Sequence, residues 1–180
     1  MSDVATQINE QIEFLHLCRS TFPHLSDKLV GKKRFPTAPY YRQKGTKIFF
    51  DFSSPLTQEF IDKFNDLGHW INQNFILRLF SVMESNGLIS ETICIRTDIA
   101  GHEELDILRR LRQKFSHGSG RYDPADPEKK KLYDRIVSHF NLDPNDYAEE
   151  EGKYPIPIDR VLIPLSEACR RYALAAQGAA

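Results

Sequence analysis

The fold is decided by the stretch SSPLTQEFIDKFNDLGHWINQNFILRLFSVMESNG, residues 53–87. Two serines followed by Pro55 are typical of a helix start, and Gly87 provides a stop. Between them, apolar side chains recur every three or four residues and cover one broad face. These are Phe60, Ile61, Phe64, Leu67, Trp70, Ile71, Phe75, Ile76, Leu79, Phe80 and Met83. So wide a face predicts the central helix of a bundle, with Gly68 as a candidate break or kink.

Further helices are predicted on both sides of this one. The residues with helical spacing or helix-start signals are 3–20, about 102–116, 126–140 and 159–176. Residues 88–101 form either a connection or a shorter helix around Ile89–Ile95. The small residues of the tail, 175–180, are expected to fray. The sequence therefore predicts an all-α fold, a bundle of about five helices in a single domain over residues 1–180.

One segment, residues 27–52, departs from the helical pattern. It is rich in lysine and arginine and is interrupted by Pro36, Pro39 and two glycines. We expect an irregular basic insertion in which residues 47–52 form a short strand. A hairpin would pair this strand with residues near Tyr40.

The cations of the insertion have two interpretations. The candidate RNA-contact residues are Lys32, Lys33, Arg34 and Arg42. In the first interpretation these cations contact a phosphate backbone, and the aromatic residues among them, Phe35, Tyr40 and Tyr41, stack on bases. In the second, which the sequence favours, the loop is solvated and its rings pack against the bundle.

Composition excludes several classes of protein. The 24 lysines and arginines against 25 acidic residues leave a net charge of -1, which excludes a globally basic nucleic-acid coat but not a local basic site. The three cysteines are far apart and form no CxxC pair, as expected for reduced thiols in a cytoplasmic protein. Neither a leader segment nor a membrane-length apolar run is visible. We expect a cytoplasmic protein with no membrane partner.

Motifs for common cofactors are missing from the sequence. It contains no phosphate-binding GxxxxGK[ST] loop, no dinucleotide-binding GxGxxG and no GxSxG nucleophile motif. His102 and Glu103 begin a zincin-like pattern that lacks its second histidine. We therefore predict neither a metal site nor a cofactor.

Arg112 and His117 are the candidate catalytic residues, in the segment LDILRRLRQKFSHGSG, residues 105–120. Its buried stripe consists of Leu105, Leu108, Leu111 and Phe115. Arg112 lies roughly 55° from the centre of that stripe, so it must snorkel, pair or line a cleft. His117 lies at the helix C-terminus, where the dipole favours an imidazolium. A turn of the chain there would bring His117 toward Arg112.

These two side chains suit phosphodiester chemistry. A guanidinium offers a planar fork to phosphate oxygens, and an imidazole moves protons near neutral pH without a metal. The alternative is a helix cap with a surface pair. The same spacing recurs at Arg19 and His24, where Pro23 intervenes and a catalytic role is discounted.

The run Leu111-Arg112-Gln113-Lys114-Phe115-Ser116-His117-Gly118 resembles the Arg-x4-His signature of HEPN domains (higher eukaryotes and prokaryotes nucleotide-binding). The long preceding helix, the polar loop and the helices after the motif are also similar, over roughly residues 55–175. The resemblance implies a helical bundle that dimerises and cleaves RNA without a metal. Arg112 and His117 would be catalytic at a composite site.

The leading hypothesis is thus a metal-independent endoribonuclease of toxin or defence type that cleaves RNA by transesterification. Because this reaction uses a base and an acid, we predict a homodimer whose two motifs face each other across a two-fold axis. The expected partners are RNA and an antitoxin or nucleotidyltransferase. The first alternative is a catalytically silent helical module that dimerises or binds a partner, and the second is a nucleotide- or ligand-binding bundle.

Overall fold

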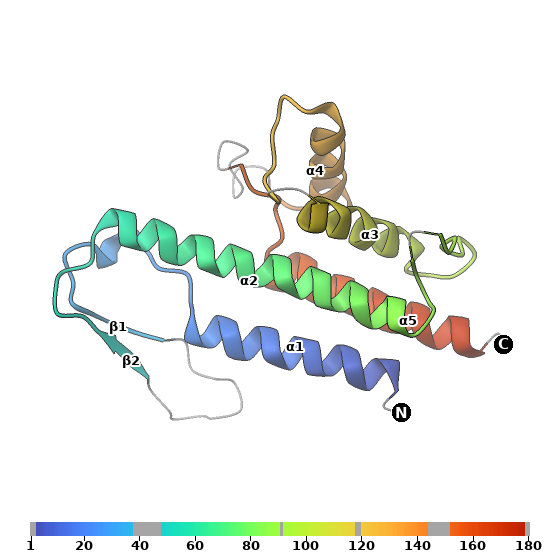
Figure 1. Cartoon of the computed structure of the whole chain (residues 1–180), viewed down its shortest axis with the longest axis horizontal. Coiled ribbons are helices and arrows are strands. Elements are labelled where there is room, and N and C mark those ends of the chain that lie inside the picture. The colour runs from blue at the N-terminus through green and yellow to red at the C-terminus, as the bar shows by residue number, and fades with distance from the viewer. Residues whose placement is uncertain (1–2, 38–47, 91, 118–119, 144–151, 179–180) are drawn as a thin grey trace. The chain divides into compact units, whose positions relative to one another are not determined.

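The structure is a computed structural model that describes residues 3–37, 48–90, 92–117, 120–143 and 152–178. In chain order its elements are α1 (Val4–Thr21), η1 (Asp27–Leu29), β1 (Arg34–Pro36), β2 (Phe49–Asp51), α2 (Gln58–Ser85), α3 (His102–His117), α4 (Pro127–His139), η4 (Ile158–Leu162) and α5 (Ile163–Gly178). The described residues are mostly helical and contain one two-stranded sheet (Figure 1). This confirms the predicted all-α class with a short hairpin.

The chain divides into two compact units. Unit 1 comprises residues 1–11 and 73–180, and unit 2 comprises residues 12–72. Helices α1 and α2 each contribute residues to both units, which are described separately below. The single domain over residues 1–180 stays a prediction.

Helix α2 ends where the sequence predicts but begins later. Its first residue is Gln58, and the hydroxyl of Thr57, not a serine at 53 or 54, accepts a hydrogen bond from the Phe60 N–H at 3.2 Å. At the other end Gly87 has a φ of 69°, a left-handed conformation that glycine adopts without strain. The N–H of Leu88 then donates to the Met83 carbonyl at 3.0 Å and closes the helix.

The interior of α2 differs from the prediction in two respects. The helix continues through Gly68 without a break, and a Cβ there would collide with the guanidinium of Arg19. Gly68 therefore makes room for a side chain and does not kink the helix. Leu67 and Trp70 were expected on the buried face, but 37% and 58% of their surfaces are exposed.

Unit 2 is built around a cluster of phenylalanine rings. Its buried centre consists of Leu25, Phe35, Leu56 and Ile61, and the partly buried side chains around it are Leu29, Phe50, Phe52, Phe60 and Phe64. Strand β1 pairs antiparallel with β2 in the register Arg34↔Asp51, Phe35↔Phe50 and Pro36↔Phe49. The predicted strand therefore exists, but it pairs with residues 34–36; Tyr40 lies outside the described residues.

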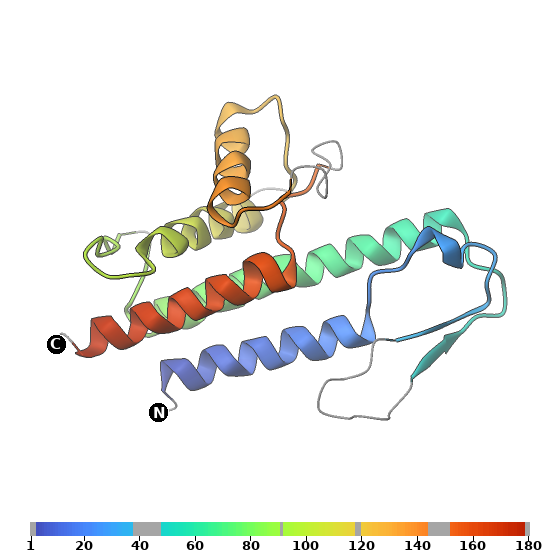
Figure 2. The same cartoon turned by 180° about the vertical axis from the view of Figure 1, so that it is seen from behind.

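Unit 1 packs α3 along α5, as both views of the molecule show (Figures 1 and 2). Its fully buried side chains include Ile76, Leu79, Met83, Leu105, Leu108, Leu111, Leu165 and Cys169. The described part of segment 88–101 contains no helix, so this segment is a connection. The N–H of Arg96 donates to the Tyr172 hydroxyl at 2.9 Å and ties the connection to α5.

The start of α4 and the end of the chain are partly as predicted. The Asp126 carboxylate accepts hydrogen bonds from the N–H groups of Glu128 and Lys129, and Pro127 occupies the first turn. The last predicted helix consists of η4 followed by α5. Residues 175–178, expected to fray, continue α5; residues 179 and 180 are outside the description. None of the described helices is long and apolar enough to cross a bilayer.

Candidate functional site

Arg112 and His117 lie together at the C-terminal end of α3. Their side chains approach to 3.4 Å between Nη1 of Arg112 and Nε2 of His117. The helix runs to His117, so the two side chains meet along it and no turn of the chain is needed. A guanidinium only donates hydrogen bonds, so the contact requires a lone pair on Nε2.

Phe80 of α2 lies beneath the guanidinium of Arg112. The Arg112 Cζ is 5.1 Å from the centre of the phenyl ring, and Phe80 itself is buried. This is the range in which a cation is attracted to a ring face. Arg112 is half-buried, which fits its predicted place beside the apolar stripe, whereas His117 is exposed. The guanidinium thus rests on an apolar surface while the imidazole reaches solvent.

A second residue of α2 holds the chain just after His117. The Gln73 amide donates from Nε2 to the carbonyl of Gly120 at 3.3 Å. Gly120 is buried and has a φ of 67°. Beyond it, the N–H of Tyr122 donates to the Gly152 carbonyl at 2.9 Å. These contacts hold Gly120 and Tyr122 in place.

Comparison with family models, curated proteins and solved structures found no match for this chain.

Contacts between aromatic rings support the C-terminal end of α3. Phe115 contacts Tyr154 edge-on, with ring centres 6.0 Å apart, and Tyr122 stacks on Tyr133 at 4.5 Å. Burial, together with the charge of Asp126, raises the pKa of Tyr154 to about 12. Its phenol is therefore neutral near pH 7. We assign these rings to the support of α3 rather than to proton transfer.

The middle of α3 carries an ion-pair cluster around Asp106. Its carboxylate pairs with Arg109 at 2.7 Å, with Arg110 at 2.9 Å and with Arg135 of α4. Burial opposes ionisation of this carboxyl, but the hydrogen bonds from Arg135, Arg110 and Arg109 outweigh it and hold its pKa well below the usual range. The cluster links α3 to α4, so we assign Arg109 and Arg110 a structural role.

We expect Asp106→Asn to lower the free energy of unfolding by about 2 kcal/mol at pH 7, because three charge-assisted hydrogen bonds lose their acceptor charge. A depressed pKa stabilises the fold at pH values above the ordinary value for aspartate, and this contribution is lost as the pH falls toward the lowered pKa. The difference between variant and wild type should shrink below about pH 4. Urea titrations between pH 2 and pH 7 measure it. Asp134→Asn, an exposed change on α4, is the control; an equal loss there would contradict the prediction.

The predicted RNA-contact residues lie in unit 2. Lys32, Lys33 and Arg34 are exposed, and Arg42 is outside the described residues. Phe35 is only 1% exposed and completes the phenylalanine cluster, so its ring packs inward, as the favoured interpretation expects, and does not stack on bases. Among the described residues of the hairpin, Phe49 is the exposed aromatic side chain, and the sequence pattern did not single it out.

Metal ligands do not gather in the part of the chain that the structure describes. No group of three or more histidine, cysteine, aspartate or glutamate side chains is placed to hold an ion there. The nearest approach to one is His139, whose Nδ1 and Nε2 lie 3.3 Å from Glu103 and 3.4 Å from Glu104. The two nitrogens face different carboxylates, and the group is not placed to hold an ion.

Proposed function

We propose that the chain is a metal-independent endoribonuclease whose catalytic residues are Arg112 and His117. The observation that carries the proposal is the 3.4 Å approach of the Arg112 Nη1 to the His117 Nε2. It puts a phosphate-binding fork beside an imidazole, and the Nε2 lone pair that accepts from Arg112 becomes available for a proton once the guanidinium turns to the phosphate. Phe80, which is buried, supports the guanidinium on one side.

The reaction follows from these groups. The Nε2 of His117 removes the proton of a ribose 2′-hydroxyl, and the O2′ attacks the adjacent phosphorus. The O2′–P bond forms while the P–O5′ bond breaks, which leaves a 2′,3′-cyclic phosphate and a 5′-hydroxyl. Arg112 stabilises the charge on the non-bridging oxygens. The O5′ takes a proton from a second acid.

A second copy of the chain is the proposed source of that acid. One imidazole cannot accept one proton and donate another in the same step, and a two-fold axis beside the site would bring the partner's His117 to the leaving oxygen. The resemblance to HEPN domains adds to the proposal a toxin or defence role, with an antitoxin or nucleotidyltransferase as protein partner.

The test is a cleavage assay on a fluorescein-labelled single-stranded RNA in the presence of a chelator. We expect cleavage to persist in the chelator and to yield 2′,3′-cyclic phosphate ends, because the 2′-hydroxyl is the nucleophile. The same oligonucleotide with 2′-deoxyribose throughout should remain intact. Cleavage of the DNA strand, or loss of activity in the chelator, would contradict the proposed chemistry.

The second candidate function is a silent module that binds a partner protein. It is favoured by large apolar side chains that are exposed on α1 and α2, above all Phe14 at 61% and Trp70 at 58%. This function predicts a chain that leaves every RNA intact and an Arg112→Ala variant with a lowered melting temperature or altered dimerisation.

A further inference from the structure

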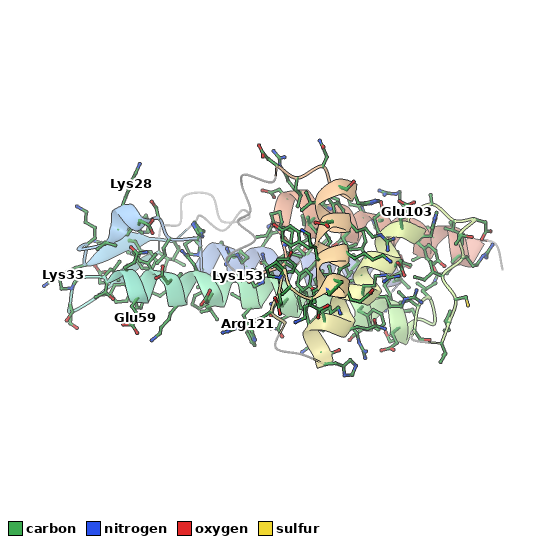
Figure 3. All side chains as sticks on the ribbon, turned by 90° about the horizontal axis from the view of Figure 1, so that it is seen from above. Lys28, Lys33, Glu59, Glu103, Arg121 and Lys153 are labelled. Atoms are coloured by element: carbon green, nitrogen blue, oxygen red, sulfur yellow. The ribbon has the colours of Figure 1, made fainter. Side chains whose placement is uncertain are left out.

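The end of unit 2 that carries η1 and β1 is locally basic, although the whole chain has a net charge of -1. The described residues 27–37 and 48–57 contain four cations, Lys28, Lys32, Lys33 and Arg34, against two carboxylates, Asp27 and Asp51. Lys28 and Lys33 extend outward from this end of the unit (Figure 3). Within the described residues, Lys28, Lys32 and Lys33 form no ion pair, although Asp62 of α2 lies beside Asp27 at this end through the amide of Gln58.

The backbone that presents these lysines is held in place. The Lys32 carbonyl accepts a hydrogen bond from the Leu56 N–H at 2.8 Å, and the Lys33 carbonyl accepts one from the Phe52 N–H at 2.8 Å. Phe35 anchors the strand beneath them in the phenylalanine cluster. Ordering this segment therefore adds little entropic cost to binding.

Beside the lysines, the outer face of the hairpin carries a flat stack. The guanidinium of Arg34 lies over the exposed ring of Phe49, with its Cζ 4.0 Å from the ring centre. Asp51, opposite Arg34 in the register, pairs with its Nε at 3.3 Å and holds the guanidinium in this position. A planar guanidinium on an aromatic ring is a surface on which an unpaired base stacks.

We propose that this end of unit 2 is a binding site for single-stranded nucleic acid. Bases stack on the Arg34–Phe49 pair while Lys28, Lys32 and Lys33 contact the phosphates. The site fits a single strand because only unpaired bases expose their faces. The site is built from other residues than the Arg112–His117 pair, and binding here requires no cleavage.

The test measures binding of fluorescein-labelled 12-nucleotide oligo(U) and oligo(dT) by anisotropy, in chelator, over a range of KCl concentrations. The full-length chain is used with His117→Ala as background, so that bound RNA stays intact. We expect both oligonucleotides to bind, and a 12-base-pair duplex to bind more weakly and without dependence on Phe49.

Two sets of variants separate the parts of the site. Replacing Lys28, Lys32 and Lys33 by glutamine should lower the slope of log affinity against log salt by about 2, because three phosphate contacts are lost. Phe49→Ala should weaken binding by about tenfold at an unchanged slope, and Phe49→Trp should restore it. The control replaces Lys63, Lys130 and Lys131 by glutamine, which changes the net charge equally.

An equal loss of oligonucleotide affinity in the control would overturn the proposal, because the electrostatic attraction would then come from the whole surface of the chain. Capture by vesicles containing anionic phospholipid but not by either oligonucleotide would also overturn it, in favour of a membrane surface. Binding that depends on Phe49 in a chain whose wild type cleaves no RNA would support this site and contradict the proposed enzyme. If the hairpin variants change neither the cleavage of RNA nor the affinity for the oligonucleotides, the result would support the proposed enzyme and contradict this site.

Discussion

His117→Ala should slow RNA cleavage by about 10²–10⁴-fold, the usual contribution of a general acid or base. Arg112→Ala should slow it by about 10²–10³-fold, by analogy with the loss of a donor that stabilises a developing oxyanion. Both effects follow from the proposed chemistry, in which Nη1 of Arg112 and Nε2 of His117, 3.4 Å apart, act on one phosphodiester. Single-turnover rates with saturating RNA measure them.

Both variants should remain folded, because His117 is exposed and Arg112 is half-buried and carries no large apolar group of the core. Their melting temperatures should therefore stay close to that of the wild type. His24→Ala is the matched control: His24 is exposed and belongs to the second Arg-x4-His spacing, with Arg19. Cleavage should be unchanged by it. A wild type that is inert on varied RNAs, with an Arg112→Ala variant that unfolds, would favour the partner-binding module.

The same variants test the composite site. If the second acid comes from another copy, an excess of inactive His117→Ala chains should suppress wild-type cleavage once subunits have exchanged. Light scattering at micromolar concentration should then show a dimer. If the excess leaves wild-type activity unchanged and light scattering shows a monomer, the proposed assembly is contradicted. The cleavage assay then still tests the chemistry of Arg112 and His117.

Gly101→Ala should have the largest effect on stability, a loss of about 3 kcal/mol in the free energy of unfolding. Gly101 has a φ of 97°, which side chains other than glycine adopt at a cost of roughly 1–2 kcal/mol. A Cβ there would also lie 2.9 Å from the carbonyl oxygen of Ala168 in α5. Overpacking of this kind costs about 1–3 kcal/mol. Urea denaturation measures the combined loss in the free energy of unfolding.

Gly68→Ala is the matched control for this prediction. Its Cβ would also collide with a neighbour, but that neighbour is the flexible end of the Arg19 side chain and not backbone. Burial lowers the pKa of Arg19, and its Nε and Nη1 have no hydrogen-bond partner among the described residues. Moving the guanidinium into solvent is therefore cheap, and alanine favours the helix by about 1 kcal/mol. A loss at Gly68 as large as at Gly101 would contradict this explanation.

Local signals in the sequence determined where several elements begin and end. Asp126 starts α4 because its carboxylate accepts hydrogen bonds from N–H groups close by in the chain, and Pro127 fits the first turn. Gly87 ends α2 because glycine itself adopts the left-handed conformation that the helix end requires. The spacing of Arg112 and His117 likewise placed both side chains on the last turns of one helix. Each of these features depends on residues close together in the chain.

Periodicity could not show which part of an apolar face would be covered. Leu67 and Trp70 fit the broad apolar pattern of α2, yet both are exposed. Their burial depends on whether another element packs on that side of the helix, which the sequence of α2 does not contain. In the same way β2 was predicted, but its partner at residues 34–36 was not, because strand pairing joins segments that are distant in the chain.

The surroundings of the candidate site were decided only by the tertiary structure. In the sequence pattern of α2, Phe80 is an ordinary core residue and Gln73 is an ordinary polar residue. In the structure Phe80 contacts Arg112, and Gln73 contacts Gly120. Arg135 of α4 reaches Asp106 of α3. The sequence by itself determined which side chains could do chemistry and which helix would carry them. Their support required the tertiary structure, because a contact between two helices depends on packing and not on the local pattern of either.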